Sequence, residues 1–170
     1  MSSAWFFVDC EACGPSLSTG TLTEFGIIHY KTGQSFHGVI YERRPNPDNP
    51  ATALMGDLIT PPDIVFRNCW NWIQEHSPNR AIMISDNPAY DFQWINDGFH
   101  QYIPDTIPVE KRNPFGHSAR RISDYYAGLT GDFTNTQRWK RLRVTPHDHN
   151  PVHDCQGNVE AFRRIQAGER

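Results

Sequence analysis

The stretch Trp5-Phe6-Phe7-Val8-Asp9-Cys10-Glu11 decides how this sequence is expected to fold. Its first four residues are aromatic or β-branched and lack a helical period, which is typical of a buried strand over residues 5–8. Asp9 would then stand at the C-terminal end of that strand. Asp9 and Glu11 are two positions apart, so they would project to the same side of the sheet, where two carboxylates can share a divalent metal ion. Taken alone, the same pair is also typical of solvent-facing charges.

Turns and apolar runs along the rest of the chain predict an α/β fold with a mixed sheet. Strands over 21–30 and 35–41 are expected to join through the hairpin turn Lys31-Thr32-Gly33-Gln34, so the first three strands form an antiparallel meander. The remaining apolar patterns predict helix 62–76, strand 81–85, a helix from Pro88 to Gly98, helix 118–127 and helix 151–166. Loops are expected over 42–50 and over 102–116, the second with room for one short strand. Because strands come first and helix–strand units follow, the α/β class is favoured.

Size and composition indicate a single domain. The 170 residues are 38% hydrophobic and 21% charged, and one core closes well at this length whereas two would both be marginal, so one domain over residues 1–170 is expected. The first apolar run, Ala4 to Val8, is too short for a signal peptide or a membrane span, which predicts a soluble cytoplasmic protein that does not contact a membrane. The cysteines are expected to be reduced thiols: Cys10, Cys13, Cys69 and Cys155.

Charge is distributed unevenly along the chain. The net charge is −3, which argues against a protein that holds duplex nucleic acid by broad electrostatics. Residues 1–105 carry 5 basic and 12 acidic side chains (net −7), whereas residues 106–170 carry 11 and 7 (net +4). An acidic pocket beside a basic surface fits these counts, and so do ordinary solvated charges placed unevenly.

Further carboxylates follow later elements of the predicted fold. Asp91 lies in an apolar stretch after strand 81–85, so we expect a carboxylate near the core, which needs a partner because burying an unpaired charge is costly. Asp86 competes for the same role, although its place at the strand end also suits an N-cap. Asp154 is expected to point inward from the first turns of the last helix, while His149 stays on the preceding loop. A mobile histidine beside a fixed carboxylate suits a general base.

These motifs, taken in order, resemble those of the DEDDh 3′→5′ exonuclease superfamily. The chain has Asp-x-Glu at 9–11, an Asn-Pro-x-Tyr-Asp segment ending at Asp91, and His-x4-Asp from His149 to Asp154 at the start of the last helix. The match spans residues 5–162, and the layout resembles small stand-alone bacterial or phage exoribonucleases. The resemblance implies a ribonuclease-H-like fold, in which helices flank a five-stranded mixed sheet whose first three strands are antiparallel.

The same resemblance implies a hydrolase that uses two Mg²⁺ or Mn²⁺ ions. Asp9 would bridge both ions, and Glu11 and Asp154 would bind the catalytic ion. Asp91 would complete the set, partly through water, and His149 would deprotonate the attacking water. The reaction would release nucleoside 5′-monophosphates from a single-stranded 3′ end. With no accessory domain and no large basic surface, RNA is expected to be a better substrate than DNA, and analogy with small relatives favours a homodimer.

Six residues are candidates for holding the substrate. They are Ala12, Cys13, Tyr90, Arg138, Lys140 and Arg141. Ala12 and Cys13 follow the Asp-x-Glu pair, where members of the superfamily commonly hold the terminal nucleotide. Segment 137–143 interleaves Trp139 with four cations, which would stack a base and grip phosphates. An exposed, solubilising loop is the alternative interpretation of this segment.

Two other functions stay open. One is a nucleic-acid-binding module that keeps the fold without turnover, although an intact set of mutually repelling carboxylates argues against it. The other is a zinc-binding interaction module. Histidine and cysteine side chains are common ligands of transition metals, and four of them are closely spaced in the sequence: His147, His149, His153 and Cys155.

Overall fold

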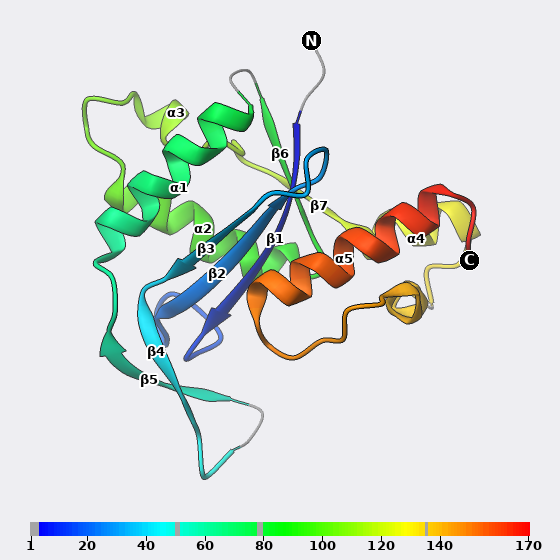
Figure 1. Ribbon diagram of the computed structural model, residues 1–170, viewed down its shortest axis with the longest axis horizontal. Helices are drawn as coiled ribbons and strands as arrows, with labels where there is room; N and C mark the ends of the chain where they lie inside the picture. The colour runs from blue at the N-terminus through cyan, green and yellow to red at the C-terminus, as the bar shows by residue number, and fades with distance from the viewer. Residues whose placement is uncertain (1–3, 50–51, 78–79, 135) are drawn as a thin grey trace.

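A five-stranded mixed sheet forms the centre of the computed structural model, which describes residues 4–49, 52–77, 80–134 and 136–170. The strand order is β3-β2-β1-β6-β7 (Figure 1). The strands are β1 (Ala4–Ala12), β2 (Leu22–His29), β3 (Ser35–Val39), β6 (Ala81–Ser85) and β7 (Ala119–Arg121). β1, β2 and β3 pair antiparallel, whereas β6 runs parallel to both β1 and β7. The α/β class and the five-stranded mixed sheet with its antiparallel meander are therefore confirmed.

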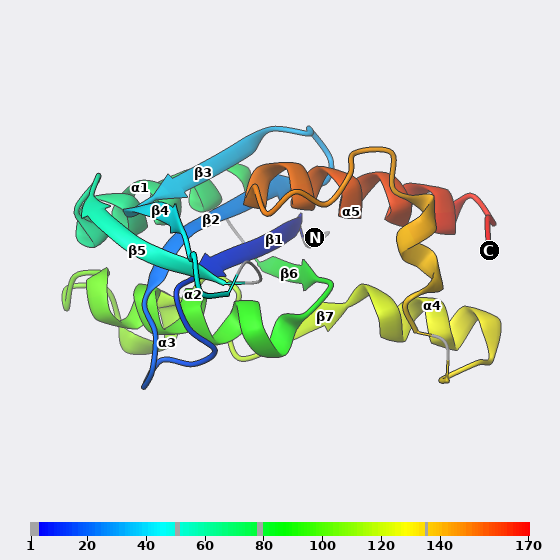
Figure 2. The same ribbon diagram turned by 90° about the horizontal axis from the view of Figure 1, so that it is seen from below.

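Helices cover both faces of this sheet (Figures 1 and 2). One face carries α1 (Pro62–His76) and α2 (Pro88–Tyr102), followed by the short helix α3 (Val109–Arg112). The other face carries α4 (Ile122–Thr130), the 3₁₀ helix η1 (Arg138–Leu142) and α5 (Pro151–Gln166). Alternate side chains of β1 fill the two cores, because successive strand residues point to opposite faces: Phe6 and Val8 pack toward α1 and α2, and Phe7 packs toward α5.

A second, two-stranded sheet extends from the main one as a hairpin (Figure 1). It consists of β4 (Tyr41–Pro45) and β5 (Ala53–Leu58), which pair antiparallel. The prediction of a loop over 42–50 was wrong for its first residues; residue 50 lies outside the described residues. Most side chains of this hairpin are exposed or only partly buried, so the apolar alternation that marks a half-buried strand is missing from the sequence.

Three predicted elements have the expected bounds, and β1 is longer than expected. The bounds of α1, β6 and α5 match the predictions. β1 continues beyond Val8 to Ala12, so Asp9 and Glu11 lie within the strand instead of following it.

Two glycines at the predicted ends of helices lie inside the observed helices. α2 continues past Gly98 to Tyr102, because this glycine serves packing: a Cβ here would fall 2.0 Å from Cζ of Phe66 on α1. α4 passes Gly128 and ends at Gly131, whose φ of 69° is the left-handed conformation that glycine adopts readily.

The helix predicted over 118–127 combines two elements, β7 and α4. β7 has three residues and pairs with β6 far along the chain, so it leaves no local signal. Within 102–116 the structure has α3 and no strand.

All four cysteines are free thiols, as expected. No helix among the described residues has the length and apolar character needed to cross a membrane.

Candidate active site

β1 and α5 bring three carboxylates together. Asp9 and Glu11 lie on the α5 face of β1, and Asp154 lies in the first turn of α5. One oxygen of each lies within 4.8 Å of the others. Asp9 is 9% exposed and Asp154 is 1% exposed, so this acidic group is largely shielded from solvent.

The start of α5 is fixed by its capping residue. Asn150 accepts hydrogen bonds from the backbone N–H groups of Val152 and His153, and Pro151 takes the first helical position, where its missing N–H costs nothing. These contacts hold Asp154 one turn into the helix. The local sequence Asn150-Pro151 thus sets where the helix begins, and this start directs the carboxylate of Asp154 inward.

Asp91 enters the site from the other helical layer. Its Oδ1 accepts a hydrogen bond from the backbone N–H of Cys10 at 3.0 Å, and its Oδ2 accepts one from the hydroxyl of Ser85. Burial raises the pKa of Asp91 to about 8, although the Ser85 hydrogen bond works in the opposite direction. The expected buried carboxylate therefore has its partners in the backbone of β1 and at the end of β6.

Asp86 belongs to the site, which corrects its interpretation as an N-cap. The capping position of α2 is Asn87, and no side chain caps this helix. Oxygens of Asp9, Asp86 and Asp91 lie within 4.8 Å of one another. Asp86 also pairs with Lys140, whose Nζ is 2.8 Å from its Oδ2. Lys140 of η1 thus forms an ion pair with Asp86, the fifth carboxylate of the site.

The electrostatics of this cluster suit a divalent cation. Burial raises the pKa of Asp9 well above its usual value, and repulsion from Asp91 and the other carboxylates adds to the effect. Both oxygens of Asp154 are buried and lack a hydrogen-bond partner among the described residues. Buried carboxylates without partners are costly, and oxygen-only ligand sets suit Mg²⁺ or Mn²⁺. The residues present therefore fit the expected metal ions.

Two histidines border the acids from the loop before α5. Nδ1 of His149 is 3.4 Å from Oε1 of Glu11, and the His149 side chain is 60% exposed. Nδ1 of His147 is 2.7 Å from Oδ2 of Asp154, without the geometry of a hydrogen bond. The histidine in direct contact with Asp154 is thus His147, whereas His149 faces Glu11.

Arg43 is a site residue that sequence reasoning missed. It comes from β4, and its Nη2 is 3.2 Å from Oε2 of Glu11. Its Nη1 donates a hydrogen bond of 2.5 Å to the backbone carbonyl oxygen of His149. Arg43 therefore joins the first acidic strand to the histidine loop. No local pattern signals this role, because it depends on the unforeseen hairpin.

A cavity of about 650 Å³ opens over the acids. Four of the six candidate substrate contacts line it: Ala12, Cys13, Tyr90 and Lys140. Arg138 and Arg141 are not among the described residues that line it, and Arg141 instead donates to the carbonyl oxygen of Arg170. Trp139 is fully buried and donates from Nε1 to the hydroxyl of Ser123 at 3.0 Å, so its interpretation as a stacking platform was wrong.

The four-residue zinc cluster expected from spacing does not assemble. The thiol of Cys155 is buried and lies 3.3 Å from the carbonyl oxygens of Phe7 and Gly26. Nδ1 of His153 is 2.8 Å from Oδ2 of Asp148. On a helix, residues 153 and 155 point in different directions from Asp154, which is why proximity in sequence did not bring these side chains together.

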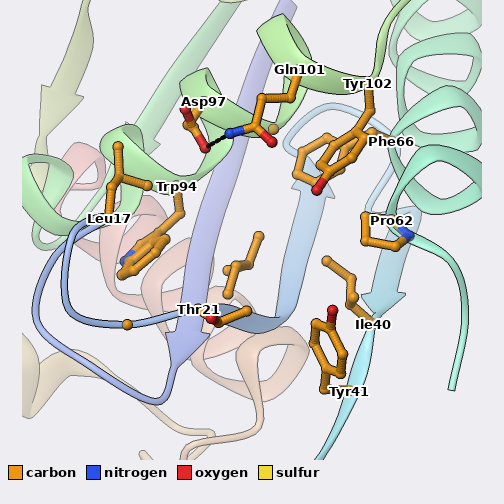
Figure 3. A pocket seen from close by; sticks show the side chains of 13 residues that line it. Leu17, Thr21, Ile40, Tyr41, Pro62, Phe66, Trp94, Asp97, Gln101 and Tyr102 are labelled. Carbon is orange, nitrogen blue, oxygen red and sulfur yellow. Dashed lines mark hydrogen bonds between the residues drawn. The ribbon is translucent and has the colours of Figure 1, made fainter. Parts of the chain in front are cut away.

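A second, smaller cavity lies on the α1 and α2 side (Figure 3). Its volume is about 220 Å³, and aromatic side chains of Tyr41, Phe66, Trp94 and Tyr102 surround it. None of the residues that we predicted for catalysis or substrate binding lines it. Among the residues that the structure describes, this cavity shares no lining residue with the cavity over the acids.

Known proteins share this fold. No protein-family model matches the chain. A 3′-5′ DNA exonuclease, Cap18 of Escherichia coli, is 30% identical over 90 residues, which is 50% of this chain and 44% of that protein. The chain therefore spans less than half of the curated relative that it matches.

Solved structures of exonucleases superpose on nearly the whole chain. The nuclease domain of 3′hExo, a DEDDh family member bound to rAMP, matches with a TM-score of 0.64 at 12% identity, over 98% of this chain and 93% of that domain. Exonuclease I of Methylocaldum szegediense matches with a TM-score of 0.62 at 15% identity, over 99% and 42%. Exonuclease I of E. coli, in a complex with single-stranded DNA and zinc, gives 0.59 at 13%, over 98% and 40%. At the level of fold, these matches confirm the resemblance to the DEDDh superfamily.

Proposed function

We propose that this chain, which shares the fold of the DEDDh exonucleases, is a metal-dependent 3′→5′ exonuclease. The observation that carries the proposal is the position of Asp9, which belongs to two acidic groups at once. One group contains Glu11 and Asp154, and the other contains Asp86 and Asp91. A carboxylate shared between two such groups is suited to bridge two divalent ions.

The metal ions would be held by the carboxylates alone. Asp9 would contribute to both ions, Glu11 and Asp154 to the first, and Asp91 to the second. When bound, two divalent ions would supply a nucleophile at neutral pH and stabilise the charge on the attacking and leaving oxygens. Asp86 lies close enough to Asp9 and Asp91 to act as a further ligand or to hold Lys140 at the cavity.

The histidine that suits the general base is His149. It is exposed on the rim of the cavity, with Nδ1 near Glu11 and its backbone held by Arg43. In this position the imidazole can take a proton from a water molecule over the acids and pass it to solvent. Tyr90 and Cys13 also line the cavity and would contact the terminal nucleotide, and Lys140 would contact a phosphate.

The substrate that we propose is a single-stranded 3′ end, which would be shortened to nucleoside 5′-monophosphates. The similar proteins support this choice, since exonuclease I of E. coli is in a complex with single-stranded DNA and 3′hExo is bound to rAMP, a nucleoside monophosphate. Preference for RNA over DNA stays a prediction, because the similar Cap18 is a DNA exonuclease. The homodimer and the cytoplasmic location also stay predictions.

The test is cleavage of 5′-labelled RNA and DNA oligonucleotides of one sequence and several lengths, with Mn²⁺ or Mg²⁺. We expect a ladder of single-nucleotide steps, faster on RNA, and no ladder in EDTA. Asp9→Ala and His149→Ala should each abolish the ladder. Asp124→Ala, which removes an exposed acid of α4 outside the cavity, should cleave like the wild type.

Three outcomes would contradict parts of the proposal. Internal cuts would indicate an endonuclease, and tight binding of the oligonucleotide without cleavage would indicate a binding module. Faster cleavage of DNA than of RNA would be consistent with the exonuclease activity but would refute the RNA preference.

A further inference from the structure

Two histidines and one acid form an arrangement typical of a transition-metal site. His147, His149 and Asp154 each offer one ligand atom, and these atoms lie within 4.8 Å of one another. The two imidazole rings meet edge to face, with centroids 4.4 Å apart. Two imidazoles and one carboxylate are a common ligand set for Zn²⁺, with water in the fourth position.

The carboxylate oxygens of Asp154 are available to bind a metal ion. Its side chain is 1% exposed, and among the described residues neither oxygen has a hydrogen-bond partner. Nδ1 of His147 lies 2.7 Å from Oδ2 of Asp154, so these two candidate ligand atoms already face each other. The side chains of His147 and His149 are 49% and 60% exposed, so an ion can enter from solvent.

The loop that carries both histidines is held in place by contacts outside the group. Asp148 accepts a hydrogen bond from the backbone N–H of Asn150 at 2.9 Å. Arg43 binds the carbonyl oxygen of His149, whose φ of 61° is rare for a residue other than glycine. The first contact stabilises the turn of the loop and the second ties the loop to β4, so the ligand atoms are held near one another without a metal.

We propose that His147, His149 and Asp154 form an inhibitory site for a transition-metal ion such as Zn²⁺. The inhibitory role rests on the proposed exonuclease function. Nitrogen ligands favour Zn²⁺ over Mg²⁺, whereas the neighbouring oxygen-only groups suit Mg²⁺. An ion held here withdraws Asp154 from the acidic cluster and His149 from proton transfer, so filling this site stops hydrolysis.

The first test is a calorimetric titration of Zn²⁺ into the full chain in excess Mg²⁺. His147→Gln should weaken zinc binding about tenfold or more, because it removes one of three ligands. His153→Gln is the matched control: this neighbouring histidine pairs with Asp148, outside the group, and its loss should leave the zinc affinity nearly unchanged. Equal zinc affinities of the wild type and His147→Gln would overturn the site.

A second measurement needs no variant. In side-chain NMR spectra of the wild-type protein, Zn²⁺ should shift the signals of His147 and His149 together. Zinc that binds without shifting either signal would overturn the proposal.

Inhibition is measured separately from binding. The zinc concentration that halves the Mg²⁺-supported rate should rise in His147→Gln by the same factor as the dissociation constant. If the chain shows no exonuclease activity with any metal while zinc binding still depends on His147, the metal site stands and its inhibitory role is refuted.

Discussion

Asp9 of β1 lies directly opposite Gly26 of β2, and the missing side chain of Gly26 leaves the space where α5 begins. A Cβ at residue 26 would fall 2.4 Å from the carbonyl carbon of Pro151 and 2.6 Å from the backbone nitrogen of Val152. Because both contacts are with backbone, a side chain there cannot be accommodated by a rotamer change. The close approach of Asp154 to Asp9 therefore depends on this glycine.

Gly26→Ala should impair activity more than stability. The added methyl group should push the start of α5 away from β2, at a cost of about 1–3 kcal/mol in the free energy of unfolding. A displacement of Asp154 on the order of 1 Å should lower kcat about 100-fold. Thermal unfolding and single-turnover cleavage measure the two effects.

The matched control for this substitution is Gly128→Ala. Gly128 lies inside α4, and nothing lies within 4 Å of a Cβ placed there. Alanine should stabilise the helix by about 0.5–1 kcal/mol and leave the cleavage rate unchanged. A Gly26→Ala protein that cleaves as fast as Gly128→Ala would contradict the role of the close approach.

Metal-free protein should become less stable relative to its Asp9→Asn variant as the pH rises from 5 to 8. Burial and neighbouring carboxylates raise the pKa of Asp9, and burial raises that of Asp91 to about 8, whereas unfolded aspartate titrates near 3.9. The folded state therefore holds more protons than the unfolded state in this range, and its stability falls with increasing pH. Asp9→Asn removes one of these ionisations, so its advantage in Tm should grow with pH.

Divalent metal should reverse this difference. Mn²⁺ binds the ionised carboxylates of the folded state, so it should raise the Tm of the wild type at pH 8 more than at pH 5. It should raise that of Asp9→Asn much less. Unfolding curves in EDTA and in Mn²⁺ measure both effects; an advantage of Asp9→Asn that shrinks between pH 5 and 8 in EDTA would refute the argument.

Local signals account for what the sequence predicted well. The prolines at the starts of α1 and α5, and the apolar run of β6, mark these elements without reference to the rest of the chain. The site was harder to predict where it depends on distant contacts. Arg43 reaches Glu11 only through a hairpin with exposed faces, and Asp86 faces Asp9 only because β6 pairs with β1 in one register. Such pairings are set by tertiary structure, which periodicity does not encode.

Lys140 and Arg141 should differ in their contribution to substrate binding. Both are exposed cations of η1, but only Lys140 lines the acidic cavity, where Asp86 holds it. Lys140→Ala should raise KM about tenfold and reduce the slope of log affinity against log salt by roughly 0.7, the value for one phosphate of a single strand. Arg141→Ala should change both quantities less. Equal effects in the two variants would mean that the substrate runs along η1 outside the cavity.

Glu160 should support catalysis by holding the histidine loop. Its carboxylate accepts hydrogen bonds from the backbone N–H groups of Val144 and Thr145, at 3.0 and 2.7 Å, and from the hydroxyl of Thr145. Burial alone would raise the pKa of Glu160, but these hydrogen bonds outweigh it and lower the pKa. Glu160→Ala should release the loop that carries His149 and lower kcat about tenfold with little change in KM.

The comparison for Glu160 uses two other variants. Glu160→Gln keeps an acceptor for one backbone N–H and should recover part of kcat. Glu169→Ala removes an exposed carboxylate that pairs only with Arg164 among the ion pairs of the described residues, and should cleave like the wild type. A loss of kcat in Glu169→Ala equal to that in Glu160→Ala would point to a general effect on α5.

The acidic cluster joins segments that are far apart in the sequence, since β1 supplies Asp9 and α5, which is synthesised after β1, supplies Asp154. A ribosome builds the chain from its N-terminus, so a nascent chain that already has Asp9, Glu11, Asp86 and Asp91 still lacks Asp154 and both histidines. For the proposed exonuclease, the growing polypeptide therefore carries no complete set of catalytic residues while it remains close to the RNA that encodes it. Under the proposed function, cleavage requires that α5 has left the exit tunnel and docked on β1 and β2.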